Sequence, residues 1–161
     1  MTRLRTAWAA APLALLMACG AGADDGAARA CTMIASSAGI AVVVEPPLAA
    51  GAVAVRARVC WDGECVDAES PLTPGQTAVD EGCDGDDPDS VCSAVMTSDG
   101  TMQGFVEAPA LPAEEVEVTA VVTRANGSEA HRAATRVTAE PTYPNGKHCD
   151  PGGNQARVTL P

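Results

Sequence analysis

The residues best suited to chemistry form an acidic segment at positions 80–89. Calcium takes six to eight oxygen ligands, and clustered carboxylates on glycine-containing turns can supply them. The candidate ligands are Asp84, Asp86, Asp87 and Asp89. Pro88 and the spacing break the Asp-x-Asp-x-Asp-Gly pattern of an EF-hand loop. The alternative is a solvated acidic loop closed by a disulfide, and we expect no resident cofactor.

A second candidate is the tripeptide His148-Cys149-Asp150. A cysteine beside a histidine can be a nucleophile or a metal ligand, but a disulfide at Cys149 would remove both roles. His131 lies in an expected strand and has no identifiable partner. No serine stands in a Gly-x-Ser-x-Gly turn or beside a recognisable His/Asp set. We therefore assign no catalytic residue and expect a protein that is not an enzyme.

The chain has seven cysteines, and Cys19 differs from the rest in its surroundings. It ends the sequence Leu-Met-Ala-Cys, which follows a basic flank at residues 3–5 and an apolar run at residues 7–18. That run is shorter than the ~20 residues of a membrane-spanning helix, so it predicts a signal peptide. Leu-x-Ala-Cys is a lipobox pattern, although Met17 departs from the usual small or β-branched residue. Cleavage without lipidation is the alternative.

A lipidated Cys19 would carry a diacylglyceryl anchor, and two acyl chains hold a protein on a membrane stably. We therefore expect three parts: a signal peptide (1–18), the lipidated cysteine with a flexible tether (19–30), and a folded domain (31–161). The expected location is the outer face of the bacterial cytoplasmic membrane. Membrane contact through Cys19 is the one partner that the sequence predicts.

Composition narrows the choice of other partners. Cleavage after residue 18 removes Arg3 and Arg5 from 10 basic residues, which leaves 8 against 21 acidic ones and a formal charge of −13. Such a charge argues against nucleic acid and against charge-driven binding to anionic lipid headgroups. Three aromatic residues remain after cleavage, so the core must be aliphatic. Small side chains bury little area each at ~25 cal/mol per Å², and disulfides should matter more than usual.

From Cys31 onward, alternating apolar residues predict β-strands and no helix of useful length. The expected strands are 39–45, 52–61, 64–70, 91–97, 101–107, 115–124, 129–140 and 155–160. Prolines fall in most of the gaps, as turn signals should. This pattern predicts an all-β fold, an immunoglobulin-like antiparallel β-sandwich with about seven or eight strands, stapled by disulfides.

One hairpin can be placed in register around Asp62-Gly63, a strong signal for a two-residue turn. Positions that sum to 125 then pair, so Cys60 faces Cys65 and two arginines face two acids on the same side of the hairpin. The other side is wholly apolar. Cys60 and Cys65 form a non-hydrogen-bonded pair with Cα atoms ~4.5 Å apart. That separation suits a disulfide, and we predict the bridge Cys60–Cys65 on the solvent side.

Two other Asx-Gly dipeptides, Asp99-Gly100 and Asn126-Gly127, also predict turns. With the second dipeptide at a hairpin tip, the expected charged pairs are Arg124–Glu129 and Glu117–Arg136.

The other two bridges follow by elimination from an even set of six cysteines in an oxidising compartment. Cys83 and Cys92 bracket the acidic segment and are expected to pair. That leaves Cys31–Cys149, which would tie the start of the domain to its last loop.

Three motifs stand behind the lipobox: Cys-Trp-Asp-Gly-Glu-Cys at 60–65, Gly-Cys-Asp-Gly-Asp at 82–86 and Tyr-Pro-Asn-Gly-Lys-His-Cys at 143–149. With the Ala/Val/Gly-rich composition, the chain resembles small secreted lipoproteins of actinomycete bacteria. The resemblance covers most of the mature chain. It implies a location and no assigned activity, and it supplies no catalytic residues.

The leading hypothesis is a lipid-anchored, non-enzymatic binding or structural module of the cell envelope. One alternative is a metal-handling or enzymatic lipoprotein, which a concave pocket with converging polar groups would support. Another is an accessory subunit whose exposed edge strand adds to a partner's sheet, which a long uncharged edge would support.

Overall fold

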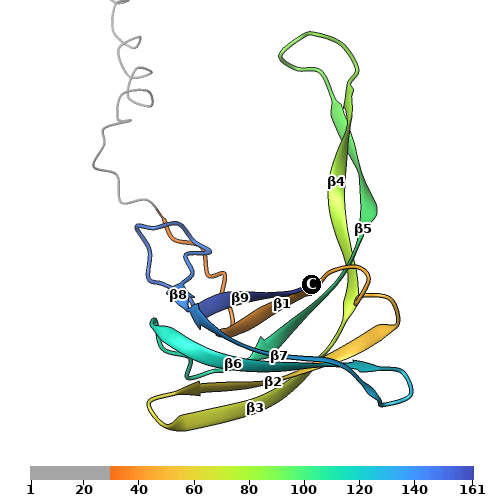
Figure 1. Ribbon diagram of the computed structural model, residues 1–161. Coiled ribbons are helices and arrows are strands. Elements are labelled where there is room, and N and C mark those ends of the chain that lie inside the picture. Colours follow the sequence, from red (N-terminus) through yellow and green to blue (C-terminus); the bar gives the residue numbers. More distant parts are fainter. Residues whose placement is uncertain (1–29) are drawn as a thin grey trace, which may run out of the picture. The chain divides into compact units, whose positions relative to one another are not determined.

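The computed structural model describes residues 30–161, which form nine β-strands and no helix (Figure 1). The strands are β1 (Gly39–Val44), β2 (Ala52–Trp61), β3 (Glu64–Pro71), β4 (Thr73–Cys83), β5 (Cys92–Glu107), β6 (Glu115–Arg124), β7 (Glu129–Thr138), β8 (Glu140–Pro141) and β9 (Asn154–Leu160). Residues Cys31–Pro161 make one compact unit. This part of the chain has no helix long and apolar enough to cross a membrane. The expected signal peptide and Cys19 lie outside the described residues.

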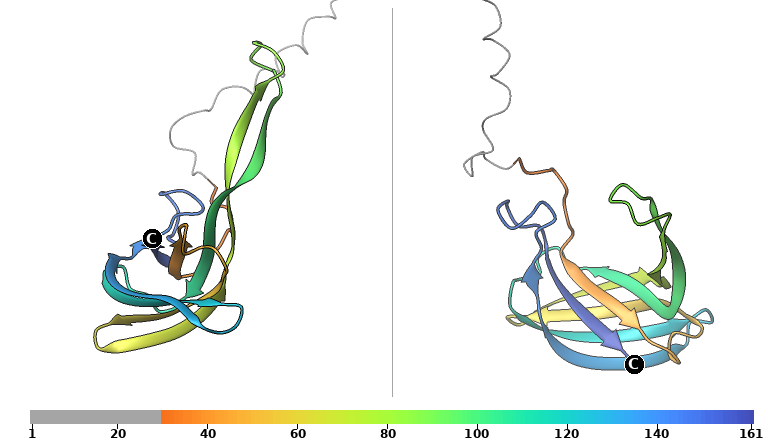
Figure 2. Two further views of the ribbon diagram at one scale, coloured as in Figure 1. Left: turned by 45° about the vertical axis from the view of Figure 1, so that its right-hand side comes forward. Right: turned by 90° about the horizontal axis from the view of Figure 1, so that it is seen from above.

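The strands form two sheets that face each other, which confirms the predicted β-sandwich (Figure 2). One sheet has the order β4-β5-β1-β9-β8 and the other has the order β3-β2-β6-β7. Strands β1 and β9 pair in parallel, and the other pairings in the described chain are antiparallel. The last strand therefore lies beside the first, which local sequence patterns cannot reveal.

Alternate residues of the central strands fill the space between the sheets, because successive side chains of a strand point to opposite faces. The buried side chains are aliphatic except for Ser70, with Val42, Val55, Val118 and Val158 among those with almost no exposed surface. The core thus lacks fully buried aromatic rings, as the composition predicts. Trp61 packs against its margin rather than standing fully exposed at the hairpin tip.

The hairpin of β2 and β3 has the register predicted from the sequence, with every pair from Trp61–Glu64 to Val55–Ser70 summing to 125. Asp62 and Gly63 form its turn, with φ of 47° and 81°. These positive values are those of a type I′ turn, which matches the twist of the flanking strands. A slip of one residue would have moved the apolar side to solvent.

Of the two charged pairs predicted for the hairpin of β6 and β7, one is wrong. Glu117 pairs with Arg136 as expected, but a register shift near the turn pairs Thr123, not Arg124, with Glu129. Gly127, at φ 78°, lies within a longer loop, and the backbone N–H of Arg124 donates to the Ser128 carbonyl at 3.0 Å. A glycine at positive φ commonly ends such a loop with a bulge, which displaces the pairing by one residue.

The expected turn at Asp99-Gly100 is wrong, because one continuous strand, β5, runs through it. The dipeptide forms a bulge opposite Gly75, where a Cβ atom would lie 2.0 Å from the Thr101 hydroxyl oxygen. Asp99 Oδ1 stabilises the bulge by accepting hydrogen bonds from the N–H of Thr101 at 2.9 Å and from its hydroxyl at 2.7 Å. An Asp-Gly pair therefore bends a strand here instead of ending it.

Strand β4 was not expected from the sequence at all. It contains Pro74 and ends among acidic residues, and beyond Gly75 all its side chains are exposed. A strand with neither face buried has no reason to alternate polar and apolar residues. The first four positions of the expected acidic loop, residues 80–83, therefore belong to β4.

Candidate functional site

Three disulfides join the cysteine pairs that the sequence predicts: Cys31–Cys149, Cys60–Cys65 and Cys83–Cys92. The last two link neighbouring strands, with Cα–Cα distances of 4.1 and 3.9 Å, whereas the first spans 118 residues. Because Cys149 is oxidised, it has no thiolate to act as a nucleophile or as a metal ligand.

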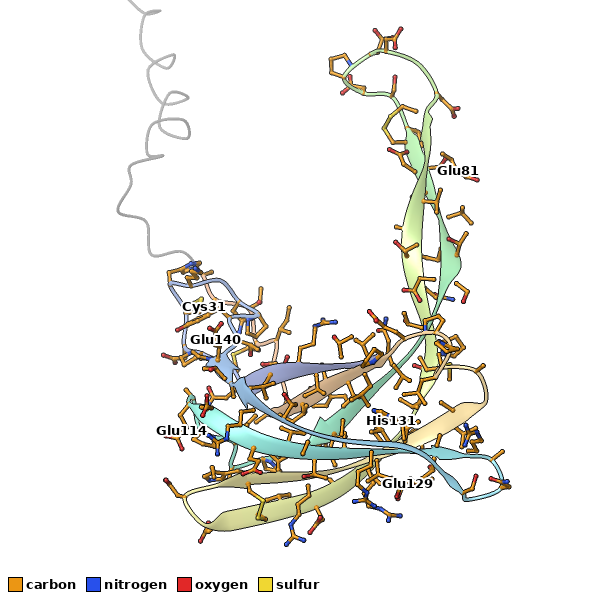
Figure 3. All side chains as sticks on the ribbon, viewed as in Figure 1. Cys31, Glu81, Glu114, Glu129, His131 and Glu140 are labelled. Atoms are coloured by element: carbon orange, nitrogen blue, oxygen red, sulfur yellow. A yellow bond between two sulfur atoms is a disulfide. The ribbon has the colours of Figure 1, made fainter. Side chains whose placement is uncertain are left out.

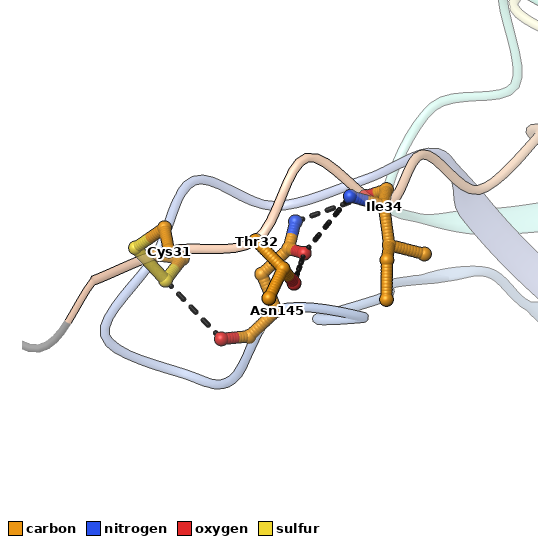
Figure 4. The surroundings of a disulfide bond; sticks show 5 residues. Cys31, Thr32, Ile34 and Asn145 are labelled. Carbon is orange, nitrogen blue, oxygen red and sulfur yellow. Dashed lines mark hydrogen bonds between the residues drawn. A yellow bond between two sulfur atoms is a disulfide. The ribbon is translucent and has the colours of Figure 1, made fainter.

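Asn145 holds the segment that leads into the domain (Figure 4). Its amide nitrogen donates to the Ile34 carbonyl at 2.9 Å, and its Oδ1 accepts from the Ile34 N–H at 3.1 Å and from the Thr32 hydroxyl. Together with the Cys31–Cys149 bridge, these bonds fix the strap of residues 31–36 against the last loop. The strap and loop enclose an open cavity of about 460 Å³.

His148 lines that cavity, and its ring lies close to the two bridged sulfur atoms. This is the one group of three potential metal ligands found among residues 30–161, and two of its three members are used up in the disulfide. The cavity is lined by two acid–base groups, His148 and Asp150, and Asp150 does not belong to that group of three. His131 lies elsewhere, half-buried on β7 opposite Val122 (Figure 3).

The calcium candidates Asp84, Asp86, Asp87 and Asp89 lie on the exposed loop that joins β4 to β5. The Cys83–Cys92 bridge closes this loop, and backbone bonds from Asp84 to Val91 and from Ser90 to Asp87, each 2.9 Å, shape it. In the described chain, no three carboxylates bring their oxygens within 4.8 Å of one another. The structure thus places the candidates on one loop without assembling a cation site from them.

The β4–β5 hairpin extends well beyond the sandwich as a projecting arm, which we define as residues 76–98 (Figures 1 and 2). All of its residues are exposed except half-buried Ser90. Met96 is 56% exposed on one face, and on the other Val79 and Val95 pair at 45% and 43% exposure. The arm therefore presents apolar side chains on both faces.

Both edges of the arm are open within the described chain. Strand β4 is the last strand of its sheet, and β5 pairs with β1 only from Met102 to Glu107. The shaft of the arm, at Gln76–Val79 and Cys92–Ser98, has no charged residue, and the charges begin at Asp80 near the tip. This is a long uncharged edge of the kind that can accept a partner strand.

A second distinctive surface is the outer face of the four-stranded sheet, on the side of the sandwich away from the arm (Figure 3). Cross-strand register places Arg56 beside Val121 and Val121 beside Arg132, with Arg58 beside Thr119 in the next row. These residues line a polar groove of about 320 Å³, which we call the arginine groove.

The cations of the arginine groove differ in how they are paired. Arg132 binds Glu129 through two hydrogen bonds of 3.1 and 2.7 Å, and Arg56 binds Glu69 at 3.1 Å. The first pair lowers the pKa of Glu129 and raises the pKa of Arg132, mainly through the side-chain hydrogen bonds. Arg58 faces Asp67 across β2 and β3, yet no ion pair joins them among the described residues.

The arm and the groove were both missed by reasoning from the sequence. Arg56 and Arg58 were placed on one face of a hairpin, but nothing local indicated that Arg132 would join them from β7. No protein-family model, curated protein or solved structure matches the chain.

Proposed function

We propose that the protein is a lipid-anchored, non-enzymatic module of the bacterial cell envelope that binds another protein surface through its projecting arm. The anchor is Cys19, the tether is residues 20–30, and the sandwich is the scaffold that presents the arm on the outer side of the cytoplasmic membrane. The observation that carries the proposal is that the arm projects from the sandwich with every residue exposed except half-buried Ser90 (Figures 1 and 2).

Energetics support a binding role for the arm. A two-stranded hairpin is at best marginally stable in water, and exposed uncharged edges invite unwanted pairing. Here the open edges extend over a shaft with exposed Val79, Val95 and Met96, and a disulfide holds the end together. A surface of this kind gains stability when a partner covers its faces or adds a strand to its edge.

The accessory-subunit alternative is a specific form of this proposal, in which the partner strand pairs along β4. The metal-handling alternative has less support, because the carboxylates at the tip do not converge and the two cysteines beside His148 are joined in a disulfide. The charge of the mature chain supports a protein partner over nucleic acid.

The test is photo-crosslinking in intact cells, with a photoreactive residue at Val95 on the arm or at Val53 on the sandwich. These valines are matched in exposure, at 43% and 41%. We expect a discrete crosslinked protein from Val95 and none from Val53. Equal yields at the two positions, or no product from Val95, would refute the arm as the binding element.

The location has its own test, because it depends on Cys19 rather than on the arm. Cys19→Ser should move the protein from the membrane fraction to the culture fluid, and the unchanged chain should carry a diacylglyceryl group by mass spectrometry. If the wild-type protein were absent from the membrane fraction, the proposed lipid anchor would be wrong, and the proposed role of the arm would be unaffected.

A further inference from the structure

We propose that the junction between the strap and the last loop, residues 142–153, is a redox-gated zinc site. When the bridge between Cys31 and Cys149 is open, their two thiolates and the imidazole of His148 bind one zinc ion. The inference goes beyond the proposed function, because it concerns the strap and not the arm. It gives a role to the motif His148-Cys149-Asp150, which the arm does not use.

The three donor atoms of this site already lie together. A ring nitrogen of His148 and the sulfur atoms of Cys31 and Cys149 are all within 4.8 Å of one another. In a tetrahedral zinc site with bonds of about 2.0–2.3 Å to nitrogen and sulfur, neighbouring donor atoms are about 3.5–4 Å apart. Once the bridge is open, the two sulfur atoms can separate to that distance, and the imidazole needs only a small shift.

The turn before Cys149 explains why the imidazole lies beside the sulfur atoms. Gly146 has a φ of 95°, and a Cβ atom at this position would lie 2.9 Å from Cε1 of His148. A residue other than glycine is strained at such a φ. The Cys149 N–H donates to the Gly146 carbonyl at 3.0 Å and closes the turn. Glycine at this position therefore leaves room for the ring against the turn, next to Cys149.

Hydrogen bonds hold the strap to the loop independently of the bridge. Asn145 joins Ile34 through two bonds, of 2.9 and 3.1 Å, and the Gly153 N–H donates to the Ser36 carbonyl at 3.0 Å. Asn145 and Gly153 stand on either side of Cys149 in the chain, so these bonds keep the two cysteines close when the bridge is open. Ligands that are already held near their bound positions lose less conformational entropy on binding.

The donor set determines the class of ion. Two thiolates and one imidazole suit zinc, whereas calcium and magnesium take oxygen ligands. The fourth position of a tetrahedral site is left to a group in the open cavity of about 460 Å³, which Asp150 also lines. Cys31 and His148 are both exposed, so an ion and a reductant have access to them.

The two other bridges lack this arrangement. Within residues 30–161, no third ligand atom of a histidine, cysteine or carboxylate lies within 4.8 Å of both sulfur atoms of Cys60–Cys65 or of Cys83–Cys92. The proposed site is therefore specific to the strap junction, and the same chain supplies its own controls.

Two routes provide the open bridge in a chain exported as proposed. Thiols are present before the disulfide forms, because oxidation follows export. Afterwards, a dithiol reductant can reopen the bridge: it passes two electrons and two protons to the sulfur atoms of Cys31 and Cys149 and becomes a disulfide itself. Zinc binding then displaces the thiol protons and joins the same two cysteines. Oxidation and zinc binding thus compete for the same sulfur atoms, which makes the site redox-gated.

The test is zinc titration of the full processed chain in mild detergent, with and without prior reduction by a phosphine in the absence of oxygen. Calorimetry should show one zinc ion bound per reduced chain, with a dissociation constant of about 1 μM or lower, and none per oxidised chain. Cobalt in place of zinc should give thiolate-to-cobalt charge-transfer absorption. Zinc should also raise the unfolding midpoint of the reduced chain, because it binds the folded form.

Variants of the two histidines test the nitrogen ligand. His148→Ala keeps every cysteine and should weaken zinc binding at least about tenfold, because even residues that only orient a metal ligand contribute about 10–100-fold. The matched control is His131→Ala, which removes the half-buried histidine of β7 and should leave zinc binding unchanged.

Variants of the bridges test the sulfur ligands. Cys31→Ser with Cys149→Ser should abolish zinc binding although the cysteines of the other two bridges remain, whereas Cys60→Ser with Cys65→Ser should retain it. Zinc binding at full strength in the first double variant or in His148→Ala would overturn the inference, as would a reduced chain that binds no zinc.

The test also holds if reduction unfolds the chain. Zinc should then refold the unchanged sequence, measured by circular dichroism, and should not refold His148→Ala. Failure of zinc to refold the unchanged sequence would equally overturn the site. Crosslinking at Val95 is independent of all these outcomes, so the proposed function and this inference can fail separately.

Discussion

The arm and the sandwich consist of strands of similar length, yet they bury very different amounts of side chain. Each central strand of the sandwich has one face in the core, where Ile40, Val55 and Val118 have no exposed surface. The arm buries neither face. Strands pair in both regions, but side chains are buried between sheets only in the sandwich, so the arm lacks the hydrophobic stabilisation that the sandwich has.

The difference also explains where disulfides matter. In the sandwich, Cys31–Cys149 closes almost the whole domain, and hydrogen bonds to Asn145 strengthen the same junction. In the arm, Cys83–Cys92 is the main substitute for a core. We therefore expect the first bridge to govern global stability and the second to govern local order.

The largest expected effect comes from removing the long-range bridge. Cys31→Ser with Cys149→Ser should lower the free energy of unfolding by about 5 kcal/mol, because a loop of this length constrains the unfolded chain strongly. Chemical denaturation monitored by circular dichroism measures it. A loss below about 1 kcal/mol would mean that the strap contributes little and that the sandwich is stable without it.

A cavity in the core should have the next largest effect. Ile40→Ala removes a fully buried side chain and should cost about 2–5 kcal/mol. Met96→Ala on the arm should change the free energy of unfolding by no more than about 0.5 kcal/mol, because Met96 is 56% exposed. Thermal unfolding of the two variants compares the regions directly, and equal losses would show that the arm packs against something in solution.

Removal of the arm's own bridge should act locally. By loop closure, Cys83→Ser with Cys92→Ser can cost at most about 2.6 kcal/mol, and we expect that cost to be confined to the arm. Limited proteolysis with thermolysin should cleave the variant near Val91 and Val95 much faster than the unchanged protein. The unfolding midpoint of the sandwich should hardly move. A shift of the whole unfolding transition would instead show that the arm unfolds cooperatively with the sandwich.

The smallest effect should come from protonation of Asp99 at the base of the arm. Hydrogen bonds from Thr101 to its carboxylate lower its pKa in the folded state. Its contribution to stability is therefore present above the ordinary pKa of 3.8 and is lost as pH falls through the lowered pKa of the folded state. The protection of the Thr101 amide, which is its exchange rate compared with the intrinsic rate at the same pH, should fall over that acidic range, and Asp99→Ala should abolish this fall. An unaltered pH profile in Asp99→Ala would show that another group controls the bulge.

The sequence predicted the structure correctly where a local pattern is compatible with a single conformation. The pair Asp62-Gly63 between two alternating runs determined a complete register, and the facing cysteines followed from it. The same kind of dipeptide at Asp99-Gly100 was misleading, because a glycine at position 75 of another strand allows a bulge where a turn was expected.

The regions that could not be predicted are those determined by distant partners or by the absence of burial. Strand β4 carries no alternation because no described residue covers its side chains beyond Gly75, and its acidic residues therefore predicted a loop. The arginine groove forms because β7 lies beside β6 and β6 lies beside β2. The spacing of residues within one segment does not predict this strand order. The exposed arm and the polar groove were therefore both invisible to patterns based on core formation.

The most direct test of the arm as a binding element is hydrogen exchange of its amides in native membranes and in the isolated monomeric protein. We predict that amides of Gln76–Val79 and Cys92–Ser98 exchange more slowly in membranes, while those of β2 and β6 exchange alike in both samples. Equal exchange of the arm in the two samples would contradict its role, because a bound partner must cover its edges or its faces.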